Sequence, residues 1–176
     1  MIHVPKTYYK LYSTSHQSIQ TLNIIKSYCS KTSTITDGTA GIGGNSIYFS
    51  LFFSKVICIE LDKEAYLILK KNLKNYRNIE FYNNDYISIS NLISQDIIFL
   101  DPPWEDNYKT KSESELYLTD TKIETIIENL YNSAKIIALK CPLNFYKQIN
   151  LWNCTTHYIY GGKKAVYKLL MFTKNN

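Results

Sequence analysis

Short apolar runs alternate with amphipathic stretches along the chain, and this alternation dominates its hydrophobic pattern. The apolar runs predict seven strands: a short one ending at Asp37, then 55–60, 79–82, 96–100, 135–140, 155–160 and 165–172. Apolar residues recur at helical spacing in the stretches 15–29, 47–52, 63–75, 86–93 and 121–133. Strands that alternate with helices predict a doubly wound α/β fold: a single, mostly parallel seven-stranded sheet with helices on both faces and an antiparallel last strand.

Turn and cap residues mark the ends of several predicted elements. Gly161-Gly162-Lys163-Lys164 joins the last two strands and is typical of a hairpin, so these two strands are expected to be antiparallel. One of residues 13–15 can cap the first helix, and Asp120 is expected to cap the last one. The polar stretch 105–119 needs no tight connection and leaves room for a lid.

The composition is that of one globular domain, since 45% of the 176 residues are hydrophobic and 20% are charged. We expect this domain over residues 15–176, preceded by a short aromatic and basic arm, residues 1–14. No apolar run is long enough to span a bilayer, and residues 1–6 lack the apolar core of a secretory signal. An intracellular protein of the cytoplasm or nucleus, with no membrane partner, is therefore expected. Its four scattered cysteines are predicted to be reduced core residues.

The charge balance is compatible with a nucleic-acid partner but decides little by itself. The formal net charge is +5 and the calculated pI is about 8.9, which also occurs in enzymes with neutral substrates. Arg77 is the only arginine, so phosphate contacts would come almost entirely from lysine, which acts as a point charge. His3, His16 and His157 lack the spacing of metal ligands, and no metal is expected.

A glycine-rich turn follows the first strand, at Asp37-Gly38-Thr39-Ala40-Gly41-Ile42-Gly43-Gly44-Asn45. Glycine is needed where backbone passes close to a ligand or takes positive φ, and the helix that follows presents free amides to that ligand. Ser46 stands where the dinucleotide fingerprint has its third glycine, so a pyrophosphate site is not supported. The acidic residue that opens the turn is typical of S-adenosylmethionine enzymes, in which it lies near the methionine part of the cofactor.

Two further acids follow later strands. Glu60 ends the second strand, where a carboxylate can accept both ribose hydroxyls of an adenosine; the alternative is a surface carboxylate at a strand end. Asp62 more simply caps the next helix. Asp85 follows the third strand, and the sequence leaves two roles open for it: a site near the adenine, or the cap of the helix predicted at 86–93.

Asp101-Pro102-Pro103-Trp104 follows the fourth strand and is the strongest candidate for a reacting centre. Proline has no amide proton and a fixed φ, so two in succession end the strand and hold their carbonyls in one rigid arrangement. A carboxylate beside such carbonyls suits an exocyclic amine of a nucleobase, and a flat aromatic beside it suits stacking of the base. The alternative is a strand-ending turn with a half-buried Trp104.

The order and spacing of these motifs resemble the Rossmann-like methyltransferases that modify exocyclic amines. The segment 37–45 followed by Pro-Pro-Trp is most similar to the trimethylguanosine synthase family, which dimethylates the 7-methylguanosine cap of RNA. Tyr12-Ser13-Thr14-Ser15 resembles that family's Phe-Ser-x-Thr segment. Asp101 stands where this family commonly has serine, and it is the residue typical of enzymes that methylate adenine or ribosomal guanine amines.

The resemblance implies S-adenosylmethionine as cofactor and capped RNA as substrate, with DNA as a further possibility. Asp101 and Pro102 would be catalytic, and Pro103 and Trp104 would bind the base. The implied cofactor residues are Asp37, Thr39, Gly41, Gly43, Asn45, Glu60 and Asp85.

Three functions stay open at this point. The first is methylation of the cap guanine amine, and the second is methylation of the exocyclic amine of an internal guanine or adenine in RNA or DNA. The third is an inactive subunit of methyltransferase fold that binds nucleic acid. Retention of Asp37, Glu60 and Asp101 together argues against the inactive subunit. For either enzyme, placement of the amine by Asp101 and the Pro102 carbonyl is expected to dominate catalysis.

Overall fold

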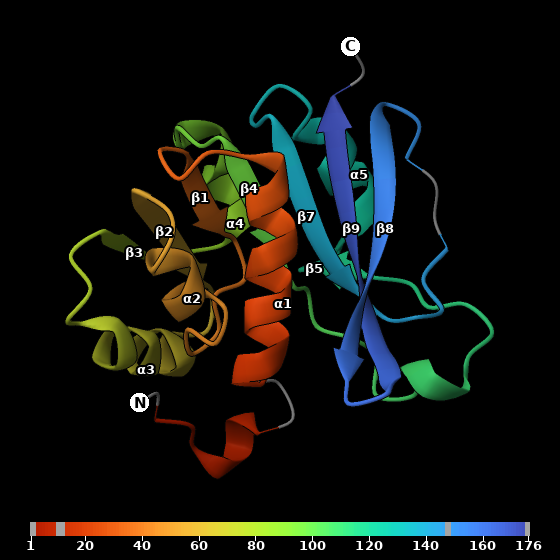
Figure 1. Ribbon diagram of the computed structural model, residues 1–176, viewed down its shortest axis with the longest axis horizontal. Helices are drawn as coiled ribbons and strands as arrows, with labels where there is room; N and C mark the ends of the chain where they lie inside the picture. Colours follow the sequence, from red (N-terminus) through yellow and green to blue (C-terminus); the bar gives the residue numbers. More distant parts are fainter. Residues whose placement is uncertain (1–2, 10–12, 147–148, 175–176) are drawn as a thin grey trace.

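The computed structural model describes residues 3–9, 13–146 and 149–174. Its main sheet has the spatial order β3-β2-β1-β4-β7-β9-β8 (Figure 1). The strands are β1 (Thr34–Asp37), β2 (Lys55–Glu60), β3 (Ile79–Asn83), β4 (Ile97–Leu100), β7 (Ile136–Cys141), β8 (Trp152–Gly161) and β9 (Lys164–Lys174). The first five are parallel, whereas β9 runs antiparallel to both β7 and β8. The predicted fold class is confirmed.

Helices cover both faces of this sheet, which is why β4, β7 and the middle of β2 are buried. On one face lie α1 (Ser15–Ile25), α2 (Ser46–Ser50) and α3 (Lys63–Leu73), whose Ile25, Phe49 and Leu69 share a core cluster with Phe99 of β4. On the other face lie α4 (Tyr86–Ile89) and α5 (Ile123–Asn129), which contribute to a second cluster around Ile98 and Leu139. Figure 1 shows α1 in front of the sheet and α5 behind it.

Several helices are shorter than their apolar patterns predicted, because single turns of 3-10 helix carry the chain away from their ends. The turns at helix ends are η2 (Lys26–Tyr28), after α1, and η3 (Ser90–Leu92), after α4. Two other 3-10 turns, η1 (Lys6–Tyr8) and η4 (Tyr108–Thr110), lie away from the α-helices. Thr14 caps α1 in a capping box with Gln17, as one of the expected residues.

The prediction that Asp120 caps the last helix is wrong. A small hairpin of β5 (Tyr117–Leu118) and β6 (Thr121–Lys122) precedes α5, and Asp120 lies in its two-residue turn beside Thr119, whose φ is 53°. The helix begins later, at Ile123, and no side chain caps it. Strand β6 of the hairpin contains Thr121 and Lys122, the residues that the sequence pattern assigned to the start of the helix.

The cysteines are all reduced, but the core prediction holds for two of them. Cys58 and Cys141 are buried, Cys29 is half-buried, and Cys154 is exposed on β8. Strand β8 is the outermost strand of the sheet, and Cys154 lies in a run of exposed residues along it. Within the described ranges, no helix is long and apolar enough to cross a membrane.

Candidate active site

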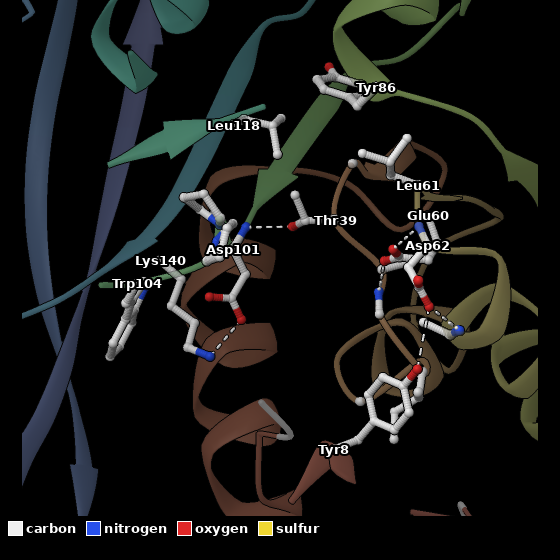
Figure 2. A pocket seen from close by; sticks show the side chains of 18 of the residues that line it. Tyr8, Thr39, Glu60, Leu61, Asp62, Tyr86, Asp101, Trp104, Leu118 and Lys140 are labelled. Carbon is white, nitrogen blue, oxygen red and sulfur yellow. Dashed lines mark hydrogen bonds and ion pairs between the residues drawn. The ribbon is translucent and has the colours of Figure 1, made fainter. Parts of the chain in front are cut away.

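A cavity of about 1290 Å³ opens where the parallel strands end, at their carboxyl edge (Figure 2). Ligand pockets usually measure roughly 300 to 1,000 Å³, so this one has room for a nucleoside cofactor and a second base. Most of the residues predicted to form the site line it: Thr39, Gly41, Asn45, Glu60, Asp85, Asp101, Pro102, Pro103 and Trp104. Asp37 and Gly43 lie behind this lining layer.

The glycine turn forms the floor of the cavity between β1 and β2. Gly41 has a φ of 53°, in the left-handed region, and a Cβ placed on it would meet no atom within 4 Å. Its requirement for glycine is therefore conformational, and it leaves the surface open to a ligand. A Cβ on Gly43 would instead lie 3.0 Å from side-chain atoms of Leu69 and Leu73, so Gly43 allows the turn to pack on α3.

Asp37 is the most deeply buried acid of the site, with 1% of its surface exposed. The Ser46 hydroxyl donates a hydrogen bond of 2.5 Å to its Oδ2, whereas its Oδ1 has no partner among the described residues. Burial raises the pKa of Asp37 to about 7; the charges of Asp101 and Glu60 add to the rise, and the Ser46 bond opposes it. The nearby Asn45 Oδ1 is also buried without a partner. Two orphaned acceptors at the two ends of the glycine turn suit a ligand with a strong donor.

Glu60 is tied to the glycine turn by both carboxylate oxygens. Oε2 accepts from the Gly41 amide and Oε1 from the Asp62 amide, each at 2.7 Å. A carboxylate oxygen can accept more than one hydrogen bond, so ribose hydroxyls can still be bound. Burial raises the pKa of Glu60, and these amide bonds oppose that rise.

Asp62 and Asp85 both cap helices, as their sequence positions indicated. Asp62 Oδ1 accepts from the Ala65 amide at 2.7 Å, and Asp85 Oδ1 accepts from the Ile87 amide at 3.1 Å. Asp85 also lines the cavity, so the cap role and a role toward a ligand are compatible at this position. Tyr8, from the N-terminal arm, donates to Asp62 Oδ1 at 3.4 Å and closes that side of the cavity (Figure 2). Tyr12 of the same arm lies outside the described residues.

Asp101 emerges from the end of β4 directly opposite the Glu60 side of the cavity (Figure 2). Its amide donates to the Thr39 hydroxyl at 2.7 Å, which joins the start of the Pro-Pro segment to the glycine turn. Pro102 is buried and Pro103 is exposed to the cavity. The two prolines thus hold a carboxylate and their own carbonyls at the strand end, as expected.

Trp104 is half-buried rather than free on the surface. Its ring meets Tyr108 and Tyr167 edge-on, with centroids 5.0 and 6.2 Å away, and its indole nitrogen is buried without a partner in the described parts of the chain. Trp104 also lines the cavity. The half-buried turn that the sequence left as an alternative is therefore present, and it coexists with a ring surface beside the cavity.

The sequence reasoning missed Lys140, which ends the apolar part of β7. Its Nζ donates to Asp101 Oδ2 at 2.6 Å and to the Ser13 hydroxyl at 2.9 Å, and it lies 4.7 Å from the centroid of the Tyr167 ring. Burial raises the pKa of Asp101, while the charge and hydrogen bond of Lys140 lower it. A lysine between the apolar residues Leu139 and Cys141 was the available signal.

The polar stretch that was expected to leave room for a lid is fastened at its middle. The side-chain amide nitrogen of Asn144 donates to the backbone carbonyls of Tyr108 and Lys111 at 2.8 and 2.9 Å. Its Oδ1 accepts from the Ser114 hydroxyl at 2.8 Å. Ser114 and Leu116 are buried, so this segment forms a fixed wall beside Trp104.

Residues 32–176 match a family described as RNA cap guanine-N2 methyltransferase. The chain belongs to this family. Protein L320 of Acanthamoeba polyphaga mimivirus, named as uncharacterized, is 35% identical over 119 residues, which are 63% of this chain and 46% of that protein. The match therefore spans less than half the length of that relative.

Solved structures share the fold of this chain at low sequence identity. An rRNA methylase from Streptococcus thermophilus superposes with a TM-score of 0.63 at 10% identity, covering 93% of this chain and 100% of the other. SMU.1697c from Streptococcus mutans, solved in complex with SAH, gives a TM-score of 0.62 at 13% identity, covering 93% and 99%. The chain thus belongs to a family of S-adenosylmethionine-dependent methyltransferases.

The residues of the cavity fit that cofactor. The orphaned Oδ1 of Asn45, which lines the cavity, and that of Asp37, behind the lining layer, can accept from the cofactor's ammonium. Gly41 leaves the surface beside the cofactor open. The Glu60 carboxylate lies at the end of β2, one strand away from β1. The hydrogen-bond acceptors of the protein along the floor of the cavity therefore match the donors of the cofactor.

Proposed function

We propose that this methyltransferase transfers a methyl group to the exocyclic amine of the guanine in a 7-methylguanosine RNA cap. The observation that carries the proposal is one cavity bordered on opposite sides by Glu60 and by Asp101-Pro102-Pro103-Trp104. The family match supports guanine N2 of a cap as the target.

The cofactor side of the cavity is proposed to be built from the first three strand ends. Asp37 and Asn45 would take the ammonium, Glu60 the ribose hydroxyls, and Asp85 the adenine amine. The turn 38–43 would pass beneath, with Thr39 and Gly41 in contact. Bound there, S-adenosylmethionine supplies a methyl group already activated by its sulfonium, so the protein need not provide a metal or a strong base.

On the opposite side, Asp101 is proposed to place the substrate amine. Lys140 donates to Oδ2, so Oδ1 would accept one amine hydrogen while the Pro102 carbonyl accepts the other. The nitrogen lone pair would then be free to accept the methyl group that the bound cofactor would supply. The ammonium that forms gives a proton to Asp101, which returns it to water. Alignment of this kind supplies up to roughly 7 to 11 kcal/mol.

A second candidate is methylation of an internal guanine or adenine of RNA, and one contact favours it. The Lys140 ammonium lies 5.5 Å from the centroid of the Trp104 ring, so a cation already interacts with the ring that would stack on the positively charged cap base. The ion pair with Asp101 offsets most of this charge, which keeps the cap as the first candidate. The fold match to an rRNA methylase is compatible with either RNA substrate.

The test offers the dinucleotides m7GpppG and GpppG, each with S-adenosylmethionine, and identifies the product nucleosides by mass. The proposal expects N2-methylated 7-methylguanosine from the first and negligible product from the second. Equal methylation of both dinucleotides would assign the enzyme to guanine without cap selectivity, and methylation of neither would remove the cap proposal.

A further inference from the structure

Lys140 and Asp101 form a nearly buried ion pair at the reacting end of the cavity. Their side chains are 9% and 17% exposed, and the Nζ–Oδ2 distance is 2.6 Å. The pairing is built into the sheet, because β4 and β7 are parallel neighbours in which Leu100 lies opposite Leu139. The next residue on each strand is Asp101 and Lys140.

The ammonium of Lys140 is held from three further directions. The Ser13 hydroxyl, just before α1, accepts its second hydrogen bond, and the rings of Tyr167 and Trp104 lie 4.7 and 5.5 Å away. Strand β9, the start of α1 and the Pro-Pro-Trp segment thus fix the ammonium against one oxygen of Asp101. Lys140 lines the cavity, and its ammonium cannot move away from Asp101 without breaking these hydrogen bonds.

We propose that Lys140 is a positioning residue that keeps Asp101 ionised and commits its Oδ2, so that Oδ1 alone meets the substrate amine. The proposal rests on the function proposed above for Asp101. A carboxylate buried without a countercharge takes up a proton, and a protonated Asp101 would offer the amine a donor instead of an acceptor. The positive charge of Lys140 prevents this protonation of Asp101 near neutral pH.

Other titratable groups also face Asp101, and each enters the design of the test. They are Cys141 from β7, Tyr167 from β9 and Asp37 from β1. Cys141 and Tyr167 have raised pKa values, so both stay neutral near pH 7. Asp37 has a pKa of about 7, so turnover is measured with saturating S-adenosylmethionine, which holds Asp37 in its bound state.

The experiment follows single-turnover methylation of m7GpppG from pH 5 to 9 in wild-type protein and in Lys140→Met. Loss of the countercharge should move the acidic limb of the profile upward by roughly 1 to 3 pH units, the range for a carboxylate that loses a neighbouring cation. Below the shifted limb, activity falls about tenfold for each pH unit of the shift and recovers as the pH rises. Lys140→Arg keeps the charge and should retain a limb near that of wild type.

A matched control exists on the same two strands. Lys135, just before β7, pairs with Asp96, just before β4, at 2.8 Å on the opposite edge of the sheet. Lys135→Met should leave the pH profile unmoved. A shifted limb in this variant would mean that loss of any lysine charge shifts the profile, which would overturn the specific role of Lys140.

A second measurement covers variants with too little activity to profile. The Asp101 carboxyl is titrated by ¹³C NMR, assigned with Asp101→Asn, in wild-type protein and in Lys140→Met, or in Lys140→Gln if the methionine variant does not fold. An unmoved titration or an unmoved acidic limb overturns the inference. Wild-type turnover in Asp101→Asn instead refutes the proposed role of Asp101, and the two failures are thereby separated.

Discussion

From the raised pKa of the buried Asp37 carboxyl group, we predict that cofactor affinity rises with pH between about 6 and 8. Its carboxyl group is buried, has a pKa of about 7, and keeps Oδ1 without a partner among the residues described. If the ionised form alone binds the cofactor ammonium, the dissociation constant is multiplied by one plus the ratio of protonated to ionised Asp37. That factor is about 11 at pH 6 and about 1.1 at pH 8, a tenfold change equal to about 1.4 kcal/mol.

Calorimetric titration of S-adenosylmethionine across this range checks the prediction, with Asp37→Asn as the matched variant. The cofactor amine titrates identically with both proteins, so the ratio of their affinities isolates Asp37. We expect the ratio to grow about tenfold from pH 6 to pH 8. A constant ratio would refute the assignment of Asp37 to the ammonium.

The same raised pKa has a consequence for the free protein. The folded-state pKa of Asp37 lies above its ordinary value of 3.8, so the folded protein retains a proton that the unfolded chain gives up. This stabilising contribution is complete below about pH 4 and is lost as the pH rises through about 7. Asp37→Asn should therefore show a smaller fall in melting temperature over that window than the wild-type protein.

Substitutions at three further positions test separate parts of the site. Glu60→Ala should weaken cofactor binding by about 1.5 to 3 kcal/mol, the range for charge-assisted hydrogen bonds, and unchanged affinity in a folded variant would remove Glu60 from the site. Wild-type protein should bind 7-methylguanosine triphosphate more tightly than guanosine triphosphate by about 0.5 to 2 kcal/mol. Trp104→Ala should erase that preference and Trp104→Phe keep part of it; a preference that survives in Trp104→Ala would show that Trp104 only packs. Asn144→Ala removes three side-chain hydrogen bonds and should cost about 1 to 3 kcal/mol of stability by thermal unfolding, whereas an unshifted melting temperature would show that they contribute nothing.

Most of the sheet was predictable from the sequence because full burial leaves a simple pattern. Strand β4 is an unbroken apolar run, and all four of its side chains are buried between helices on both faces. The β5–β6 hairpin was not predictable, since each strand is two residues long and shows no periodicity. Its presence displaced the start of α5 by two residues from the predicted Thr121.

The candidate site divides in the same way. Asp37, Glu60 and Asp101 follow recognisable strands, and parallel strands bring their carboxyl ends to one edge, so their proximity could be inferred. The residues that hold these three acids in place could not be inferred from the sequence. Ser13 meets Lys140 across 127 residues of sequence, and this contact depends on how α1 lies against the sheet.

Transfer of tritium from S-adenosylmethionine to three matched polymers tests the central claim most directly. The polymers are an RNA with a 7-methylguanosine cap, the same RNA without a cap, and DNA of the same sequence. We predict label in the capped RNA alone, released with the cap nucleotide on digestion, and none after Asp101→Ala. Equal labelling of the uncapped RNA or of the DNA would contradict a cap-specific enzyme.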